Sequence, residues 1–139
     1  MREIKFRGKM LDGGRWIYGS LLTWPDGETY ILYDRDFATT VTMSKDPVRP
    51  ETVGQYTGLK DKNGKEIYEG DIIEQAAFRY DKNVHRYRMA WIDKTGEFGA
   101  FEIGKPIGPP TMYCVIAHFC KIMEVIGNIH DTPELLKED

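Results

Sequence analysis

The chain has 139 residues, of which 41% are apolar, and a formal net charge of −3. This length and composition are typical of one ordinary globular domain, and they exclude collagen, coiled coils and wholesale disorder. The slightly acidic balance argues against a protein that coats nucleic acid with a strongly basic surface.

The first third of the chain is predicted to form short strands. Residues 3–7 alternate polar and apolar side chains, which is the period of a half-buried strand. Two runs rich in aromatic and branched residues, 15–23 and 29–33, flank the turn residues Pro25-Asp26-Gly27. We expect these runs to form a hairpin. Residues 39–43 are predicted to add another short strand.

The middle of the chain carries its strongest hairpin signal, the pair Asn63-Gly64. This pair predicts a type I′ turn, which needs positive φ at both central residues. Gly70 and Asp71 predict a corner between two strands. All four residues suit a backbone geometry rather than a reaction.

A second hairpin is predicted further along the chain. Its strands are residues 76–80 and 85–92, on either side of a turn at 81–83. A strand at residues 98–103 follows.

Residues 112–123 fit either a buried strand or a buried helix, because apolar side chains occupy nearly every position. This region is too short and too polar to span a membrane. It holds both cysteines, Cys114 and Cys120, and the sequence MREIKFRGKM at the N-terminus lacks the apolar stretch of a secretory signal. We therefore expect reduced thiols and a cytoplasmic protein without membrane contact.

The closing segment predicts a strand at residues 124–129, with Gly127 and Asn128 at its end, and then a short helix. Thr132 is a typical N-cap, and Pro133 suits the first helical position. Six or more short strands, with turns about every eight to twelve residues, predict an all-β barrel or sandwich.

Three stretches resemble the YopX-like proteins of bacteriophages and prophages: Ile4–Arg7, Gln55–Ile73 and Glu124–Leu136. The central stretch is long and specific, whereas residues 75–120 match only loosely. The resemblance implies a mainly β fold with a small barrel-like part, and a phage-derived protein in the bacterial host cytosol. It supplies no catalytic residues, because the biochemical role of that family is uncharacterised.

We therefore expect a single YopX-like domain over residues 1–139, mainly β in class. Residues 1–58 are predicted to form N-terminal β-hairpins. Residues 59–139 are predicted to form a small SH3-like barrel followed by the short C-terminal helix.

A candidate nucleic-acid site lies at residues 78–88, where basic and aromatic residues interleave as in a stacking platform with phosphate contacts. The residues that would make these contacts are Arg79, Tyr80, Lys82, Arg86, Tyr87 and Arg88. The same pattern also describes an aromatic row facing a core and a basic row facing solvent. In a strand, Arg86 and Arg88 share one face, opposite Tyr87.

The candidate metal ligands are Cys114, His118, Cys120 and His130. A strand spreads the first three over some 20 Å, and zinc needs its ligands about 2.0–2.3 Å from one point. The spacing therefore predicts buried thiols and a core histidine, with no metal and no cofactor.

The chain contains no G-x-S-x-G, H-E-x-x-H, P-loop or Rossmann pattern, so we expect no enzyme. By elimination, the sequence favours a phage or prophage accessory protein that is a non-catalytic binding or self-assembling module. Its expected partner is another copy of itself or a different protein. The alternative is a nucleic-acid-binding regulator that uses residues 78–88.

Overall fold

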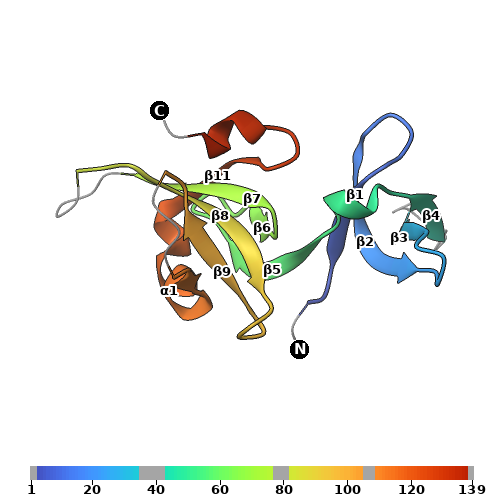
Figure 1. Ribbon diagram of the computed structural model, residues 1–139, viewed down its shortest axis with the longest axis horizontal. Helices are drawn as coiled ribbons and strands as arrows, with labels where there is room; N and C mark the ends of the chain where they lie inside the picture. The colour runs from blue at the N-terminus through green and yellow to red at the C-terminus, as the bar shows by residue number, and fades with distance from the viewer. Residues whose placement is uncertain (1–2, 35–42, 77–81, 105–108, 138–139) are drawn as a thin grey trace. The chain divides into compact units, whose positions relative to one another are not determined.

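The computed structural model describes residues 3–34, 43–76, 82–104 and 109–137 (Figure 1). Strands dominate these residues and pair antiparallel, which confirms the predicted mainly β class. The chain divides into an N-terminal unit, Met1–Tyr56, and a C-terminal unit, Thr57–Asp139.

The N-terminal unit contains four strands in the spatial order β4-β3-β2-β1. The elements are β1 (Phe6–Lys9), β2 (Trp16–Thr23), β3 (Thr29–Asp34), β4 (Met43–Pro47) and the short 3-10 helix η1 (Pro50–Thr52). Strand β5 (Gly54–Lys60) begins in this unit, where it pairs with β1, and continues into the C-terminal unit. Ile17, Ile31 and Val48 form the buried core of the N-terminal unit.

The predicted hairpin of residues 15–23 and 29–33 is present as β2 and β3. Its turn contains Gly27 at φ +92°, and the Thr29 hydroxyl donates a hydrogen bond to the Gly27 carbonyl at 3.1 Å. The strand predicted at residues 39–43 falls mostly outside the described residues, and the described strand β4 begins at Met43.

The residues that follow β4 lie beside the residues that follow β1. Met10 and Val48 form an antiparallel bridge, and the Leu11 N–H donates to the Pro47 carbonyl at 3.1 Å. Gly8 makes this approach feasible, because a Cβ at this position would lie 3.0 Å from Val48 Cβ. The strands of this unit therefore curve around their shared core.

The C-terminal unit is built on a five-stranded sheet in the order β10-β9-β8-β7-β11. The strands of this sheet are β7 (Asp71–Gln75), β8 (His85–Ile92), β9 (Glu97–Glu102), β10 (Thr111–Met112) and β11 (Met123–Asn128). The unit also contains β6 (Glu66–Tyr68), which pairs with β5. The pairings among the described residues form an open sheet and close no barrel, unlike the SH3-like barrel that the sequence predicted.

Residues 112–123, which the sequence left open, are mainly helical. They continue from β10 into α1 (Tyr113–Phe119) and the 3-10 helix η2 (Cys120–Ile122). Ile116 and Cys120 are buried and belong to the core of the C-terminal unit. None of the helices in the described part of the chain is long and apolar enough to cross a membrane.

The turn at Asn63-Gly64 joins β5 and β6, but its geometry differs from the predicted type I′ turn. Gly64 has φ +79°, whereas Asn63 does not have positive φ. The Asp61 carboxylate accepts hydrogen bonds from the Asn63 and Lys65 N–H groups at 2.8 and 2.9 Å. This arrangement corresponds to a longer hairpin loop that needs only one left-handed glycine.

The C-terminal helix is the 3-10 helix η3 (Pro133–Leu136) rather than an α-helix. Thr132 occupies the predicted N-cap position and Pro133 begins the helix, but the Thr132 side chain makes no capping hydrogen bond. Its hydroxyl instead accepts a hydrogen bond from the Asn128 N–H at 3.0 Å and donates one to the Asn128 carbonyl at 2.9 Å. Thr132 therefore holds the end of β11 in place.

Candidate functional site

Two residues of β8 within the basic segment at residues 78–88 contact acidic side chains of neighbouring strands. Arg86 Nε donates to Glu74 Oε2 at 2.9 Å across the β7–β8 pairing. His85 Nδ1 lies 2.7 Å from Glu102 Oε1 on β9. The Arg86 contact directs the positive charge of this residue toward a carboxylate of the same sheet.

Tyr87, the aromatic residue of the candidate site that the structure describes, lies on the face of β8 opposite Arg86 and Arg88. Tyr87 packs against the apolar core of the C-terminal unit. Arg88 projects from the opposite face, and its guanidinium lies 5.3 Å from the centre of the Phe101 ring. Lys82 is exposed, and Arg79 and Tyr80 lie outside the described residues. Tyr87 therefore faces the core, as the second interpretation of the sequence pattern predicted.

Gly70 and Asp71 form a tight corner between β6 and β7. Gly70 has φ +91°, and its N–H donates to the Met89 carbonyl at 2.8 Å. The buried Asp71 carboxylate accepts a hydrogen bond from the Tyr68 N–H at 2.7 Å. Gly127 lies in β11, where a Cβ would meet Thr132 Oγ1 at 2.1 Å. The contacts of these residues organise the backbone.

The two cysteines differ in exposure, so the prediction that both thiols are buried holds only for Cys120. Cys114 is exposed, and Cys120 is buried with its thiol donating to the Ala117 carbonyl at 3.4 Å. Within the ranges that the structure describes, no three histidine, cysteine, aspartate or glutamate side chains are grouped to hold a metal ion.

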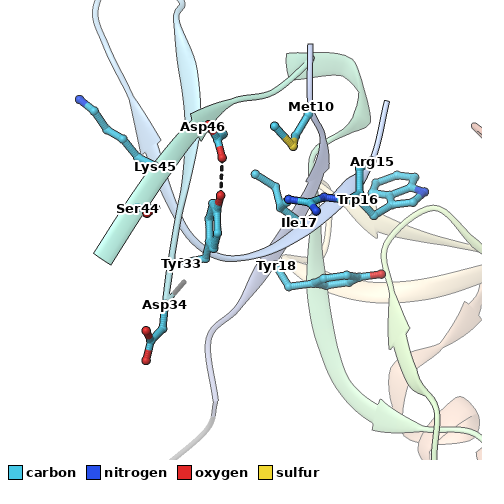
Figure 2. A pocket seen from close by; sticks show the side chains of 10 residues that line it. All are labelled: Met10, Arg15, Trp16, Ile17, Tyr18, Tyr33, Asp34, Ser44, Lys45 and Asp46. Atoms are coloured by element: carbon cyan, nitrogen blue, oxygen red, sulfur yellow. Dashed lines mark hydrogen bonds between the residues drawn. The ribbon is translucent and has the colours of Figure 1, made fainter. Parts of the chain in front are cut away.

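A hollow lined by described residues lies in the N-terminal unit, and we call it the N-terminal pocket (Figure 2). Strand β2 pairs with β1 through residues 16–19 but with β3 through residues 20–23. A pocket of about 980 Å³ lies beside this change of partner. Its lining residues are Met10, Arg15, Trp16, Ile17, Tyr18, Tyr33, Asp34, Ser44, Lys45 and Asp46.

Figure 2 shows an apolar centre in this pocket with polar groups around it. The side chains of Met10 and Ile17 point into the space between β4 and the start of β2. On the β4 side, the Tyr33 hydroxyl donates a hydrogen bond to the Asp46 carboxylate. Tyr33 pairs with Ser44 in the β3–β4 register, so it reaches Asp46 diagonally, as side chains on one sheet face do.

Lys45 extends from β4 onto the other face of the sheet, where it meets two aromatic rings. Its ammonium lies 5.4 Å from the centre of the Trp24 ring and 5.0 Å from that of Tyr30. A hydrogen bond from the Tyr30 hydroxyl to Glu28 raises the pKa of Tyr30 above its ordinary value of 10.0, and burial adds to this. The rim of the pocket thus carries an exposed cation in an aromatic setting.

Reasoning from the sequence assigned residues 15–23 and 29–33, which contain Trp16 and Tyr33, only to the strands of a hairpin. It missed Arg15, Lys45 and Asp46 as members of one site. The alternation of residues 43–47 as a strand was the available signal, because it places Ser44 and Asp46 on one face.

Two comparisons with known proteins extend over nearly the whole chain. A crystal structure of protein EF1440 from Enterococcus faecalis is 25% identical in sequence, with a TM-score of 0.57, and the match covers 99% of this chain and 100% of that one. No curated protein matches the chain. Residues 5–137 match the family model described as YopX protein. The chain therefore belongs to the YopX protein family.

Proposed function

We propose that this protein is a non-catalytic binding module that holds a segment of a protein partner in the N-terminal pocket. The observation that carries the proposal is the pocket itself, which combines an apolar centre with charged side chains at its rim. Its volume lies within the range of ordinary ligand sites. An apolar centre with a polar rim is also the usual composition of a protein interface.

The lining chemistry supports binding over catalysis. It contains neither histidine nor cysteine, and the Asp46 carboxylate already accepts a hydrogen bond from Tyr33. An enzyme site of this size would be expected to hold a nucleophile beside a base or acid that is oriented toward it. Resemblance to phage and prophage proteins supports an accessory role in the bacterial cytoplasm.

Peptide binding tests the proposal directly. Purified protein is used to select from a display library of random dodecapeptides, and the selected peptides are titrated by calorimetry. We expect Ser44→Trp to abolish binding, because the indole would fill the pocket. Val84→Trp at an exposed position of the C-terminal unit is the matched control and is expected to leave binding unchanged. Equal binding by both variants would refute the pocket as the site.

The alternative is a nucleic-acid-binding regulator that uses residues 78–88. The ion pair of Arg86 with Glu74 counts against it, because a phosphate contact made by Arg86 would have to replace this carboxylate contact. The two functions differ in their salt dependence. Nucleic-acid binding releases counterions from the phosphates, so its affinity falls steeply as the salt concentration rises. Light scattering at low and high salt, with and without short DNA, separates them and also reports self-association.

A further inference from the structure

The backbone N–H and C=O groups of successive β4 residues point alternately toward β3 and away from it. One hydrogen bond shows which residues point toward β3. The Val48 N–H donates to the Thr29 carbonyl at 2.9 Å, directly beyond the β3–β4 pairs that include Asp46 with Ile31. Hydrogen-bonded pairs alternate in an antiparallel ladder. Ser44 and Asp46 therefore direct their N–H and C=O groups toward β3, and Met43 and Lys45 direct theirs away from it.

Among the strands that the structure describes, β4 is the last in the order of its sheet. Pro47 ends its outward edge, because proline has no N–H and its carbonyl already accepts a hydrogen bond from the Leu11 N–H. The outward stretch of β4 thus carries two donors and two acceptors, at Met43 and Lys45. That pattern matches the backbone of one short extended segment.

The side chains along this edge alternate in the same way. Lys45 is exposed on one face of the sheet, whereas Ser44 and Asp46 line the N-terminal pocket on the other. A segment that pairs with β4 would place one side chain opposite Lys45 and its neighbours toward the pocket. Met10 and Ile17 supply apolar contacts there, and Lys45 favours a carboxylate directly opposite.

We propose that the partner segment binds as an added β-strand along the outer edge of β4, with an acidic residue opposite Lys45 and an adjacent apolar residue in the N-terminal pocket. This inference rests on the proposed function and specifies its geometry. Main-chain hydrogen bonds at Met43 and Lys45 supply affinity, and the pocket selects the apolar side chain.

Amide hydrogen exchange of the intact protein tests the added strand, with a dodecapeptide selected from the random library as the probe. Peptide binding is expected to slow exchange of the Met43 and Lys45 amides at least tenfold. The Ser44 and Asp46 amides, already bonded to β3, are expected to change little. This measurement uses the wild-type protein and reports directly on the backbone N–H groups that the added strand would bond.

A matched pair of substitutions separates backbone from side chain at the same position. Lys45→Pro removes the outward N–H, at a place where an edge strand accepts proline. We expect it to weaken the peptide at least tenfold. Lys45→Ala keeps the N–H, so the protection of the Lys45 position is expected to persist, with a smaller loss of affinity for acidic peptides.

The outcomes distinguish the two proposals. Peptide-induced shifts of the Met10 and Ile17 methyl signals without protection of Met43 and Lys45 would overturn the added strand and leave the pocket as a binding site. A library that yields no peptide shifting those methyl signals would refute the proposed function itself. Protection that appears without peptide, together with a doubled mass at high protein concentration, would identify a second copy on this edge and overturn the proposal of a partner segment.

Discussion

The Asp61 carboxylate and the Val125 N–H are 64 residues apart in the chain and form a buried hydrogen bond of 2.9 Å. The same carboxylate binds the Asn63 and Lys65 N–H groups through its other oxygen. One side chain thus organises the β5–β6 turn and attaches it to β11. A backbone bond from the Lys62 N–H to the Met123 carbonyl, at 2.9 Å, reinforces this attachment.

Acid is expected to weaken the fold through Asp61. Burial raises the pKa of this carboxyl, but the backbone hydrogen bonds from Val125, Lys65 and Asn63 outweigh it and hold the pKa below the ordinary value of 3.8. The charged form is therefore favoured in the folded state. Its contribution to stability is fully present above that ordinary value and is lost as the pH falls through the lower folded pKa.

Asp61→Asn tests this role by urea unfolding across pH. An amide cannot accept all three bonds as a carboxylate does, so we expect a loss of about 2 kcal/mol at neutral pH. The loss should shrink as the pH falls below about 4. Asp93→Asn, at an exposed position, is the control and should leave the free energy of unfolding within about 0.5 kcal/mol. An equal loss at every pH would contradict the ionised carboxylate.

Gly127 is expected to tolerate no side chain while Thr132 holds Asn128. A Cβ at Gly127 would lie 2.1 Å from Thr132 Oγ1 and 3.1 Å from Leu135 Cδ1. We expect Gly127→Ala to lower the free energy of unfolding by about 1–3 kcal/mol through this overlap. In a Thr132→Ala background the same change should cost less, because the oxygen atom is gone. Additive losses in this double-mutant cycle would show that the overlap is not the cause.

Gly19 marks the place where β2 changes partner. A Cβ there would lie 2.0 Å from the Leu32 carbonyl oxygen, which is backbone and cannot move without the strand. Gly19→Ala is therefore expected to cost about 1–3 kcal/mol and to disturb the β2–β3 pairing beside the N-terminal pocket. Chemical denaturation reports the loss, and Ser20→Ala at the next, exposed position is the control.

The two cysteines are expected to react at different rates with iodoacetamide. Cys114 is exposed, whereas Cys120 is 6% exposed and lies within the core of the C-terminal unit. Mass spectrometry of the native protein should show one rapid adduct, and denaturant should allow the second. Cys114→Ser should remove the rapid adduct. Two rapid adducts in the native wild type would contradict the burial of Cys120.

Local signals in the sequence predicted the β2–β3 hairpin well, because Pro25 and Gly27 act within the turn they form. They failed at Asn63, where the turn conformation depends on Asp61 and on hydrogen bonds to β11. Asp61 is a near neighbour, but Met123 and Val125 of β11 lie about sixty residues further along the chain, and no local pattern encodes their contacts with this turn.

The N-terminal pocket was out of reach for a similar reason. Its residues come from four separate stretches of the chain, and no stretch by itself has the composition of a site. Arg15 stood within a run of strand formers, and Asp46 preceded a proline. Only the bend of the sheet, with Met10 bridged to Val48, brings them around one space.

Pro47 has a consequence for solubility. The unpaired backbone groups of an exposed sheet edge can pair with another chain, so identical chains can stack into fibres. Long, flat edges carry the highest risk of such aggregation. Here a proline at the end of β4 and a lysine in its middle shorten and charge that edge. Open-ended stacking is discouraged by the same features that leave room for one short strand. An edge that accepts one short partner strand, as proposed above, would thus be protected from open-ended aggregation.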